Sequence, residues 1–562
     1  MDEPTNLVQA KHILTIVIED YYQVGSFQHL IPNDYWGRFE SRLKRNVDVA
    51  LALLERTNST ATFFVCGWIA DYHPEIIKII ASKGHEIACQ GYFHHNLESI
   101  PKAEFVKDIK RSKEAVERAL GKQVQGFRIA RGWLKPSQLW LLQELADMGF
   151  EYDSSLCRHG FQFASQPEYG VIHKHALANS SIYEVPVSSG SIWKWSMPIA
   201  GGNYWRQFPL WPFHKWIQKW VSSHQEPLVS YFHIWELDPN QPVISAASML
   251  QKIRHYRNLA TMQDKIQHYL QEYSFTSIQQ HLDLPEPANV SATEQQNIDA
   301  SRSPVLSKQA DLTVVIPCYN EEQTLAYLKN TLQRFEQSSQ GLFNLHYIFI
   351  DDGSTDNTMQ CLQSLFGENK QTRILQHQRN QGIAAAILTG FAKVDTELLA
   401  VIDADCTFSP EQLIDMYSLL TDDVDVVSAS PMHNQGSMQN VAYWRQSMSK
   451  GAAFLHSLVL HNKLTSYTSC FRLYRRHTIK GLQVTNKGFC GVTEILAKID
   501  LAGFKIVEFP AMLEVRLLGA SKINVIKTML DHLRLVARIA RMRLFGKSTT
   551  KDLVDKDEQR VE

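Results

Sequence analysis

A long stretch without aromatic residues divides this chain of 562 residues into two halves. No Phe, Trp or Tyr occurs between Phe275 and Tyr319, and much of the stretch consists of Pro, Ser, Ala, Asn and Gln. This composition is typical of a linker, because it offers too little apolar surface to form a core. The chain also exceeds the usual size of one domain. The predicted segments are a first domain at 11–282, a linker at 283–310, a second domain at 311–521, a helix at 522–547 and a tail at 548–562.

Both halves alternate strand-like and helix-like segments, which is the pattern of α/β proteins with parallel sheets. In the first half we expect strands at 13–20, 61–70, 86–90, 181–188 and 227–237, and helices at 74–84, 102–120 and 136–148. In the second half we expect strands at 312–320, 345–354, 373–378, 397–405 and 424–430. Open parallel sheets bind their ligands at the carboxyl ends of the strands, so functional residues are sought there.

The composition limits the function and the location of the protein. Lys and Arg number 57 against 58 Asp and Glu, a balance that excludes a general nucleic-acid-binding surface. No run reaches the roughly 20 apolar residues that span a bilayer, and the N-terminal segment lacks the pattern of a secretory signal. The eight cysteines are widely spaced, so neither a disulfide framework nor a cysteine zinc site is indicated. We expect a cytoplasmic protein with reduced thiols.

Two aspartates, Asp403 and Asp405, end the apolar segment ELLAVIDAD of the second half. Residues two apart on an extended chain point to the same side. Two carboxylates on one side can bind a divalent cation, and hard oxygen ligands suit Mg²⁺ or Mn²⁺. The alternative is that one aspartate caps the helix that begins near Ser409 and Pro410. The pair alone does not decide between these interpretations.

Further motifs of the second half accompany this pair in a fixed order. They are IPCYNEE with Asn320, IDDGSTDNT with Asp351 and Asp352, the glycine turn of RNQGIAAAILTGF, SCFRLYRR at 469–476 and RLLGASK at 516–522. Together with the aspartate pair they resemble glycosyltransferase family 2. The last two motifs are similar to signatures of the subgroup that moves sugars onto polyprenyl or dolichyl phosphate. The resemblance implies an α/β GT-A (Rossmann-like) fold over nearly the whole second half.

The resemblance assigns a role to each matching position. The donor nucleotide would be bound by Asn320, Asp351 and Asp352. The metal and the diphosphate would be bound by Asp403 and Asp405, with Asp405 taking part in catalysis. Facing the acceptor phosphate and the donor diphosphate would be Arg472, Arg475, Arg516, Ser521 and Lys522, a role that suits guanidinium forks. The alternative for 469–476 is a solvated basic edge strand.

The implied reaction is a single displacement that inverts the anomeric carbon of a sugar carried by a nucleoside diphosphate. A polyprenyl phosphate oxygen is already a nucleophile, so charge neutralisation and positioning matter more than a strong protein base. Two sites depart from the family pattern. Cys406 and Thr407 follow the aspartates, which leaves a third metal contact open, and Cys470 replaces the usual glycine.

The pattern of segment 522–547 predicts a basic amphipathic helix. Its apolar stripe is Ile526, Leu530, Leu533, Val536, Ala540 and Leu544, and its basic stripe is Lys527, Arg534, Arg538 and Arg541. Such a helix can lie in the headgroup plane of a membrane, which fits a lipid-linked acceptor. The alternative is a helix that packs on the protein's own core with its charges in water. We expect peripheral association with the cytoplasmic face of the membrane.

Five segments of the first half resemble the polysaccharide deacetylase (NodB homology) domain, in the branch associated with exopolysaccharide genes. They are IVIEDYYQV, GHEIACQGYFHH, GFRIARG, EYDSS and YFHIWELDP. The resemblance implies a distorted β/α barrel that binds Zn²⁺ or another divalent metal. It makes Glu19 the base, Asp20 and His94 metal ligands, Arg128 the residue that steadies the base and His233 the general acid.

The first half also departs from that family at important positions. Gln90 stands where the first metal histidine is expected, and a neutral amide is a much poorer zinc ligand than imidazole. The Pro that usually follows the Arg-x-Ala-type turn is absent from Arg128-Ile129-Ala130-Arg131, and Ile234 stands where Pro usually follows the late His. We therefore favour an impaired or metal-altered site in a domain that binds carbohydrate or serves as a scaffold. The alternatives are a bifunctional enzyme that deacetylates an N-acetylated lipid-linked sugar, and a non-catalytic sugar-lipid-binding assembly factor.

Overall fold

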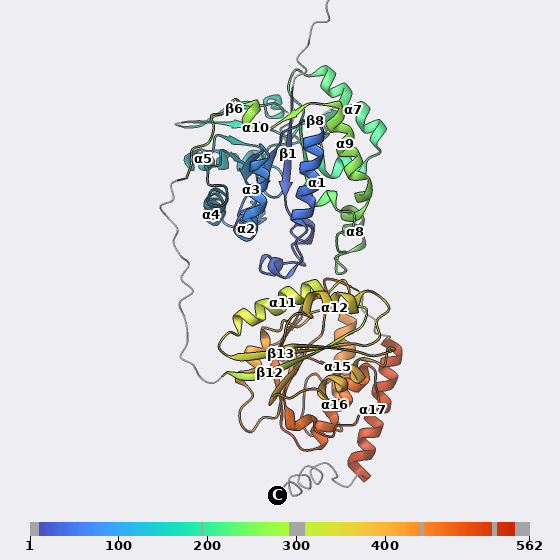
Figure 1. Ribbon diagram of the computed structural model, residues 1–562. Helices are drawn as coiled ribbons and strands as arrows, with labels where there is room; N and C mark the ends of the chain where they lie inside the picture. Colours follow the sequence, from blue (N-terminus) through green and yellow to red (C-terminus); the bar gives the residue numbers. More distant parts are fainter. Residues whose placement is uncertain are drawn as a thin grey trace, which may run out of the picture. The chain divides into compact units, whose positions relative to one another are not determined.

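The computed structural model describes residues 11–163, 165–178, 180–192, 195–290, 309–438, 443–519 and 525–545. They form two compact units (Figure 1), which are described separately. The first contains most of the described chain up to residue 290, and the second contains most of it from residue 309 onward. Among the described residues, every helix is too short or too polar to cross a membrane.

The first unit is built on a nine-stranded sheet in the order β10-β1-β2-β3-β4-β5-β7-β6, with β11 paired to β1. Its strands are β1 (His12–Ile18), β2 (Thr62–Val65), β3 (Glu86–Cys89), β4 (Gly126–Phe127), β5 (Tyr152–Asp153), β6 (His173–Ala176), β7 (Ser181–Glu184), β10 (Val229–His233) and β11 (Phe275–Thr276). All neighbours are parallel except β6 and β7. The described pairings form an open sheet, a half-barrel. A separate hairpin joins β8 (Ser189–Ile192) to β9 (Trp195–Pro198).

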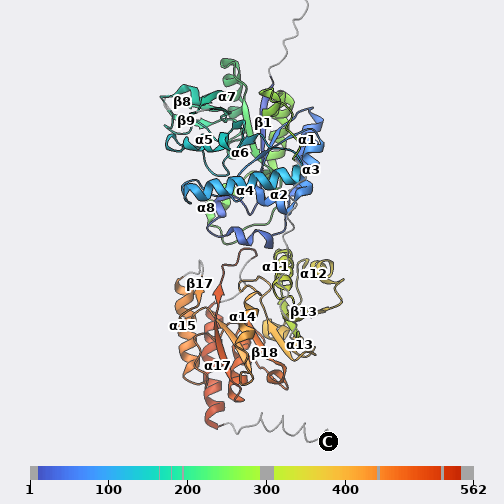
Figure 2. The same ribbon diagram turned by 90° about the vertical axis from the view of Figure 1, so that its left-hand side faces the viewer.

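Helices follow most strands of the first unit, as parallel connections require. They are α1 (Leu43–Arg56), α2 (Gly67–Tyr72), α3 (Pro74–Ser82), α4 (Lys102–Leu120), α5 (Trp140–Asp147), α6 (Gly202–Gln207), α7 (Leu210–Ser223), α8 (Met249–Tyr256), α9 (Met262–Glu272) and α10 (Ile278–His281). The helix α4 packs against α2 and α3 (Figure 2). The expected strand 61–70 ends at Val65, because the chain turns into α2 at Gly67.

The second unit contains a seven-stranded sheet in the order β14-β13-β12-β15-β18-β16-β19. Its strands are β12 (Ala310–Cys318), β13 (Phe343–Asp351), β14 (Thr372–Gln376), β15 (Leu398–Val401), β16 (Val426–Ser430), β18 (Arg472–Arg475) and β19 (Ile506–Pro510), and a separate pair joins β17 (Ser437–Met438) to β20 (Met512–Leu513). Only β18 runs antiparallel to its neighbours in this sheet. The alternative of an edge strand at 469–476 is therefore wrong, because β18 lies inside the sheet.

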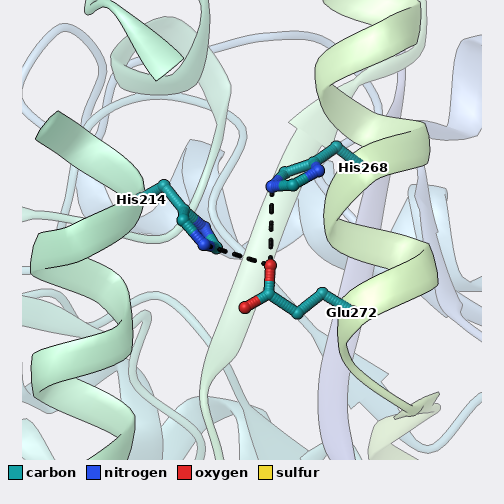
Figure 3. A group of neighbouring side chains, drawn as sticks. All are labelled: His214, His268 and Glu272. Carbon is teal, nitrogen blue, oxygen red and sulfur yellow. Dashed lines mark ion pairs between the residues drawn. The ribbon is translucent and has the colours of Figure 1, made fainter. Parts of the chain in front are cut away.

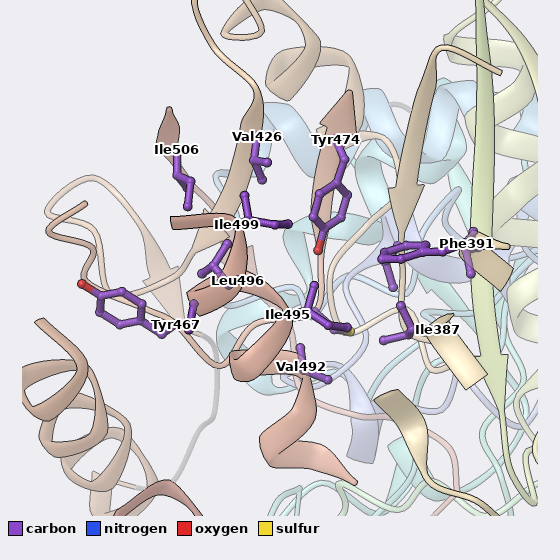
Figure 4. Packing of buried hydrophobic residues seen from close by; sticks show 14 of the residues in the cluster. Ile387, Phe391, Val426, Tyr467, Tyr474, Val492, Ile495, Leu496, Ile499 and Ile506 are labelled. Atoms are coloured by element: carbon purple, nitrogen blue, oxygen red, sulfur yellow. The ribbon is translucent and has the colours of Figure 1, made fainter. Parts of the chain in front are cut away.

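Helices cover this sheet and complete its core. They are α11 (Leu325–Ser338), α12 (Thr358–Phe366), α13 (Ile383–Phe391), α14 (Gln412–Ser418), α15 (Tyr443–Ser457), α16 (Phe489–Leu501) and α17 (Val525–Phe545). Figure 4 shows Tyr474 of β18 beside Ile495 of α16 and Phe391 of α13, with 5.7 Å between the ring centroids of Phe391 and Tyr474. This apolar cluster includes Leu399 and Val401 of β15 and so anchors the strand that precedes Asp403.

The segment after residue 282 does not leave the first unit at once. Asn289 forms a bridge to Lys122, and the amide of Val290 donates to the backbone oxygen of Gly121. The residues expected to begin the linker thus lie against the turn that ends α4. The central part of the expected linker and the expected tail 548–562 lie outside the described residues.

The helix α17 packs on the second unit through a different face from the one expected. Leu535 and Ile539 are buried in the core cluster, whereas Leu530 and Leu533 are exposed. Leu535 and Ile539 do not belong to the predicted apolar stripe, whereas the exposed Leu530 and Leu533 do. One apolar side joins the protein core, as the alternative held, and a second apolar side faces solvent.

Candidate functional site

The carboxyl ends of β13, β12 and β15 lie side by side at one edge of the second sheet. Cys318 at the end of β12 pairs with Asp351 at the end of β13. Val315 of β12 pairs with Val401 at the end of β15. The loops that carry Asn320, Asp352, Asp403 and Asp405 leave the sheet from these ends. The fold therefore brings together loops that are far apart in sequence, as expected for a parallel sheet.

Arg516 links two carboxylates at this edge. Its Nη2 lies 2.6 Å from Oε2 of Glu321, and its Nη1 lies 3.2 Å from Oδ2 of Asp405. Its Nε donates a hydrogen bond to the backbone oxygen of Leu518. The side chain of Asp405 is 14% exposed, so this ion pair lies near the surface of the sheet edge. The guanidinium of Arg516 thus lies beside Asp405, an expected metal ligand.

Asp403 lies next to Asp405 but has no such cationic partner among the described contacts. Its Oδ1 accepts a hydrogen bond from Sγ of Cys470 at 2.9 Å. Burial, and then the charge of Asp405, raises the pKa of Asp403 to about 7. Burial also raises the pKa of Asp405, although Arg516 opposes this effect. Both pKa values stay raised although Arg516 is near, so the positive charge present does not fully compensate the pair and a divalent cation fits it.

Asp351 and Asp352 are buried and their carboxylates hold local backbone. Oδ1 of Asp352 accepts from the amide of Gln381 at 2.9 Å, and its Oδ2 accepts from the amide of Gly382 at 2.7 Å. His377 lies 2.7 Å from the same Oδ1. Asp351 accepts from the amide of Ser354 at 3.1 Å. These two aspartates therefore shape the loops of the edge, and donor binding by them stays a prediction.

Gly382 has a φ of 101°, and a Cβ placed there would meet the backbone of Lys487 at 2.4 Å. Only glycine tolerates both conditions. The turn expected from RNQGIAAAILTGF is thus held by Asp352 at one side and by close approach of the chain at the other.

Asn320 joins the loop after β12 to the loop after β13. Its Oδ1 accepts from the amide of Thr355 at 2.7 Å, and its own amide donates to Oγ of Ser354 at 2.9 Å. Its backbone has a φ of 52°, a left-handed conformation that Asn adopts more readily than most residues. The residue expected to bind the donor therefore also fixes the loop that precedes Glu321.

The structure does not place Arg472 and Arg475 where the resemblance predicts them. Arg472 is fully buried, and its guanidinium donates to the backbone oxygens of Val492 at 2.9 Å and Tyr467 at 2.8 Å. Arg475 pairs with Leu398, at the opposite end of β15 from Asp403. Because β18 is antiparallel, residues late in this motif run away from the site. Neither guanidinium is available to a phosphate at the carboxyl edge.

Of the other residues expected to bind phosphate, Arg516 is at the edge. Ser521 and Lys522 lie outside the described residues. Two further residues of the edge were not predicted as binding residues. They are Glu321, which directly follows Asn320, and Cys470, which was noted as a departure from the family pattern. Glu321 could have been predicted from its position, because it directly follows Asn320, a predicted donor-binding residue.

In the first unit, Glu19 lies between two histidines. Its Oε1 is 2.5 Å from Nδ1 of His233, and its Oε2 is 3.2 Å from Nδ1 of His94. Nε1 of Trp235 donates to Oε1 of Glu19 at 2.9 Å. Burial alone would raise the pKa of Glu19, but the charge and hydrogen bond of His233, and then the charge of His94, lower it to about 2. The expected base, acid and metal ligand therefore form one buried cluster, in which burial lowers the pKa of His94.

The other expected members of the deacetylase site make different contacts. Both oxygens of Asp20 accept backbone hydrogen bonds, from Arg42 at 2.8 Å and from Tyr21 at 3.0 Å. Arg128 donates to Thr15 at 2.8 Å and to the backbone oxygen of Ser154 at 2.9 Å. The guanidinium of Arg128 thus joins β1 to the segment after β5, and its role in steadying Glu19 stays a prediction.

Several buried polar atoms of the first unit have no hydrogen-bond partner in the described part of the chain. Oε1 of Gln90 and Nε2 of His94 are among them, and both side chains are almost fully buried. Among the described residues of this site, no three ligand atoms of His, Cys, Asp or Glu lie within 4.8 Å of one another. With Gln90 in place of histidine, the residues present do not fit a tight zinc site.

Three family models match parts of the chain. Glycosyl transferase family 2 matches residues 313–482, polysaccharide deacetylase matches residues 34–152, and a domain of unknown function matches residues 158–283. The first two matches agree with the two resemblances found from the motifs.

The curated relatives match the second half. The chain is 27% identical over 230 residues to dolichol-phosphate mannosyltransferase of Pyrococcus furiosus, which covers 41% of this chain and 63% of that protein. It is 26% identical over 218 residues to polyprenol monophosphomannose synthase of Mycolicibacterium smegmatis, which covers 38% of this chain and 80% of that protein. The chain thus spans less than two thirds of the first relative.

Among solved structures, a mannosyltransferase of Pyrobaculum calidifontis in complex with GDP-Man and Mn²⁺ aligns with 15% identity and a TM-score of 0.32. This alignment covers 42% of this chain and 67% of that chain. By the family models and the curated relatives, the chain carries a polysaccharide deacetylase domain in its first half and, in its second half, a glycosyltransferase family 2 domain that resembles dolichol-phosphate mannosyltransferase.

Proposed function

We propose that the second domain is a metal-dependent, inverting glycosyltransferase that moves a sugar from a nucleotide-sugar to a polyprenyl-phosphate-type lipid. It would act at the cytoplasmic face of a membrane, in cell-envelope or exopolysaccharide synthesis. The observation that carries the proposal is the meeting of Asp403, Asp405 and Arg516 at the carboxyl edge of the sheet. The two curated relatives, both named for transfer of mannose to a polyprenol-type carrier, support the acceptor class.

Asp403 and Asp405 would hold Mg²⁺ or Mn²⁺. When bound, such a cation supplies charge neutralisation at a diphosphate. Mg²⁺ sites of this kind use one or two carboxylates and complete the coordination with water and substrate phosphates. Two partly exposed aspartates at a sheet edge match that requirement. The raised pKa of Asp403 supports the same proposal, because the pair needs positive charge in order to ionise fully.

Arg516 would bind a phosphate of the donor or the acceptor. Its guanidinium already spans Glu321 and Asp405, so it lies beside the proposed metal ligand. A guanidinium binds phosphate in a forked geometry that lysine cannot reproduce. The ion pair with Asp405 would be exchanged for phosphate contacts when substrate binds. Of the arginines that the resemblance assigned to phosphate, Arg516 keeps this role in the proposal.

The lipid would be reached through the solvent-facing apolar side of the second unit. Met529, Leu530 and Leu533 of α17 are exposed, and so are Phe454 of α15 and Leu458 just after it. The helices α15 and α17 pack together, and His456 lies 3.1 Å from His532 between them. Arg534 and Arg541 are exposed on α17, as expected for a surface that contacts anionic headgroups.

The first domain would recognise a sugar without hydrolysing it. A zinc hydrolase of this kind needs an imidazole where Gln90 stands, and it needs Asp20 free to bind the metal. In this chain both oxygens of Asp20 accept backbone hydrogen bonds. Glu19, the expected base, is held between His233 and His94. These contacts favour an impaired site over a second catalytic activity.

The proposal is tested by incubating the purified full chain with radiolabelled nucleotide-sugars and polyprenyl phosphate, with Mn²⁺ or with a chelator. We expect labelled lipid that requires the cation and is lost in Asp403→Asn. Asp415→Asn, at an exposed position on α14, is the matched control and should keep activity. Transfer that persists in the chelator and in Asp403→Asn would refute the metal-dependent mechanism. Release of acetate from N-acetylated lipid-linked sugar would instead establish the bifunctional alternative.

A further inference from the structure

Two histidines and a glutamate meet between α7 and α9 of the first unit, and none of them belongs to the two sites described above (Figure 3). His214 lies on α7, and His268 and Glu272 lie four residues apart on α9. Residues four apart project from the same face of a helix. One ligand atom of each of the three side chains lies within 4.8 Å of the others. The three residues lie between the neighbouring helices, with side chains converging on one point.

The distances within this group match those between the ligands of a tetrahedral metal ion. Nε2 of His214 is 3.2 Å from Oε2 of Glu272, and Nε2 of His268 is 3.4 Å from the same oxygen. Ligands about 2.0–2.1 Å from Zn²⁺ in tetrahedral geometry are about 3.3–3.4 Å from one another. A charge-assisted hydrogen bond between nitrogen and oxygen is shorter, at about 2.7–2.9 Å. Two edges of the tetrahedron are therefore already in place.

The surroundings orient the ligands and leave room for the ion. Gln218 of α7 donates through Nε2 to Oε1 of Glu272 at 3.0 Å, which turns Oε2 toward the two histidines. The Nδ1 atom of His214 is buried without a partner in the described part of the chain, so this ring offers Nε2 as its ligand atom. The side chain of His268 is 41% exposed and can rotate to close the third edge. A water molecule can reach the remaining position.

We propose that His214, His268 and Glu272 bind one Zn²⁺-class transition-metal ion that ties α7 to α9. Two imidazoles and one carboxylate form a donor set suited to Zn²⁺ or Co²⁺. The two rings, with centroids 4.9 Å apart, would repel each other if both were protonated. A shared divalent ion removes that repulsion and binds both helices. The ion would therefore stabilise this region of the first domain.

The test uses the purified full chain, stripped of metal and titrated with Zn²⁺ and with Co²⁺. We expect about one equivalent of Zn²⁺, and intense visible absorption of tetrahedral Co²⁺, to be lost in His268→Ala and in the isosteric Glu272→Gln. Affinity should fall at least about 100-fold, since a direct ligand matters more than the outer partners whose loss costs about 10–100-fold. His29→Ala, at an exposed position of the same unit, is the control and should bind as the parent does.

Two further measurements make the result specific. Asp403→Asn should keep the tetrahedral Co²⁺ spectrum, because its oxygen-ligand site lies in the second unit. Zn²⁺ should raise the melting midpoint followed by tryptophan fluorescence in the parent but not in Glu272→Gln. Unchanged Zn²⁺ stoichiometry and an unchanged Co²⁺ spectrum in both His268→Ala and Glu272→Gln would overturn the proposal and leave a group of ion pairs.

Discussion

Oε1 of Glu19 lies 2.5 Å from Nδ1 of His233, so the two residues expected to act as base and acid of a deacetylase form an ion pair. The charge and hydrogen bond of Glu19 raise the pKa of His233 above its ordinary value, although burial alone would lower it. A histidine and a carboxylate at this distance neutralise each other and need no metal to be stable. The ion pair thus forms without a metal. For metal binding, the site lacks an imidazole ligand at position 90.

Gln90→His should restore metal binding to the first domain. Oε1 of Gln90 and Nε2 of His94 are both buried without partners in the described chain, so an imidazole at position 90 can share a cation with His94. We expect the variant to retain one more equivalent of Zn²⁺ than the parent, measured by elemental analysis after dialysis. Gln90→His combined with His94→Ala should lose that equivalent. A variant that gains none would show that Asp20 is not free to complete the site.

Arg516→Ala should reduce sugar transfer by at least about 100-fold in kcat/KM, because loss of one fixed hydrogen-bond donor to a developing negative charge costs about 100- to 1,000-fold in kcat. Arg516→Lys should recover little, since an ammonium does not fork between two acceptors. Arg475→Ala is the matched control, because its register places it at the far end of β15. Equal losses in Arg475→Ala and Arg516→Ala would contradict the assignment of Arg516. The readout is initial transfer rate at several donor concentrations.

Arg472→Met should destabilise the second domain and not act on substrate binding specifically. The substitution removes the donors to the backbone oxygens of Tyr467 and Val492. A buried acceptor left without a partner costs about 1–3 kcal/mol. We expect a lower melting midpoint by circular dichroism, with KM for the donor unchanged in the fraction that remains folded. An unchanged melting midpoint with a raised KM would return Arg472 to the phosphate-binding role.

The sequence predicts those strands and helices whose hydrophobic pattern lies within one short segment. The strands before Asn320, Asp351 and Asp403 were predicted because each is a buried apolar run followed by polar residues, and parallel order then required their ends to meet. The place of β18 could not be read in this way. Whether Arg472 faces a phosphate or the core depends on strand direction and on which strands lie beside β18, and both are set by long-range pairing.

The sequence also does not predict which way the side chains at the sites point. Asp352 and Asp403 both end strands and look alike in the sequence. In the fold, Asp352 accepts two backbone amides, whereas Asp403 faces Cys470 and the charge of Asp405. The group formed by His214 and Glu272 was missed for a related reason, since its members lie far apart in the chain and only the packing of α7 on α9 joins them.

The stability of the first domain should depend on pH through Glu184. Burial, and then the charge and hydrogen bond of Asp153 on the neighbouring strand, raises the pKa of Glu184 well above its ordinary value of 4.5. The folded protein therefore keeps a proton that the unfolded chain releases. This contribution is complete below pH 4.5 and is lost as pH rises toward the folded pKa, by about 1.4 kcal/mol per pH unit.

Glu184→Gln tests that dependence, because the amide is neutral at every pH. Eleven of the twelve tryptophans lie in the first half, so tryptophan fluorescence reports the melting of this domain. As the pH rises from 5.5 to 8.5, the melting midpoint of the parent should fall further than that of Glu184→Gln. Ser155→Ala, which removes a hydroxyl that donates to Asp153 at 2.7 Å, should lower the midpoint but keep the slope. Identical slopes in the parent and Glu184→Gln would contradict the raised pKa.

The exposed apolar side of α17 should bind membranes. Leu530 and Leu533 are each 46% exposed, whereas Leu535 of the same helix is buried in the core. Insertion of one leucine into an apolar environment contributes about 1.5–3 kcal/mol. Replacement of both exposed leucines by serine should therefore weaken binding to anionic vesicles at least about 10-fold in a flotation assay. Leu250→Ser, at an 80% exposed position on α8, is the control and should bind as the parent does. Equal binding of the double variant and the parent would contradict membrane binding by this side of α17.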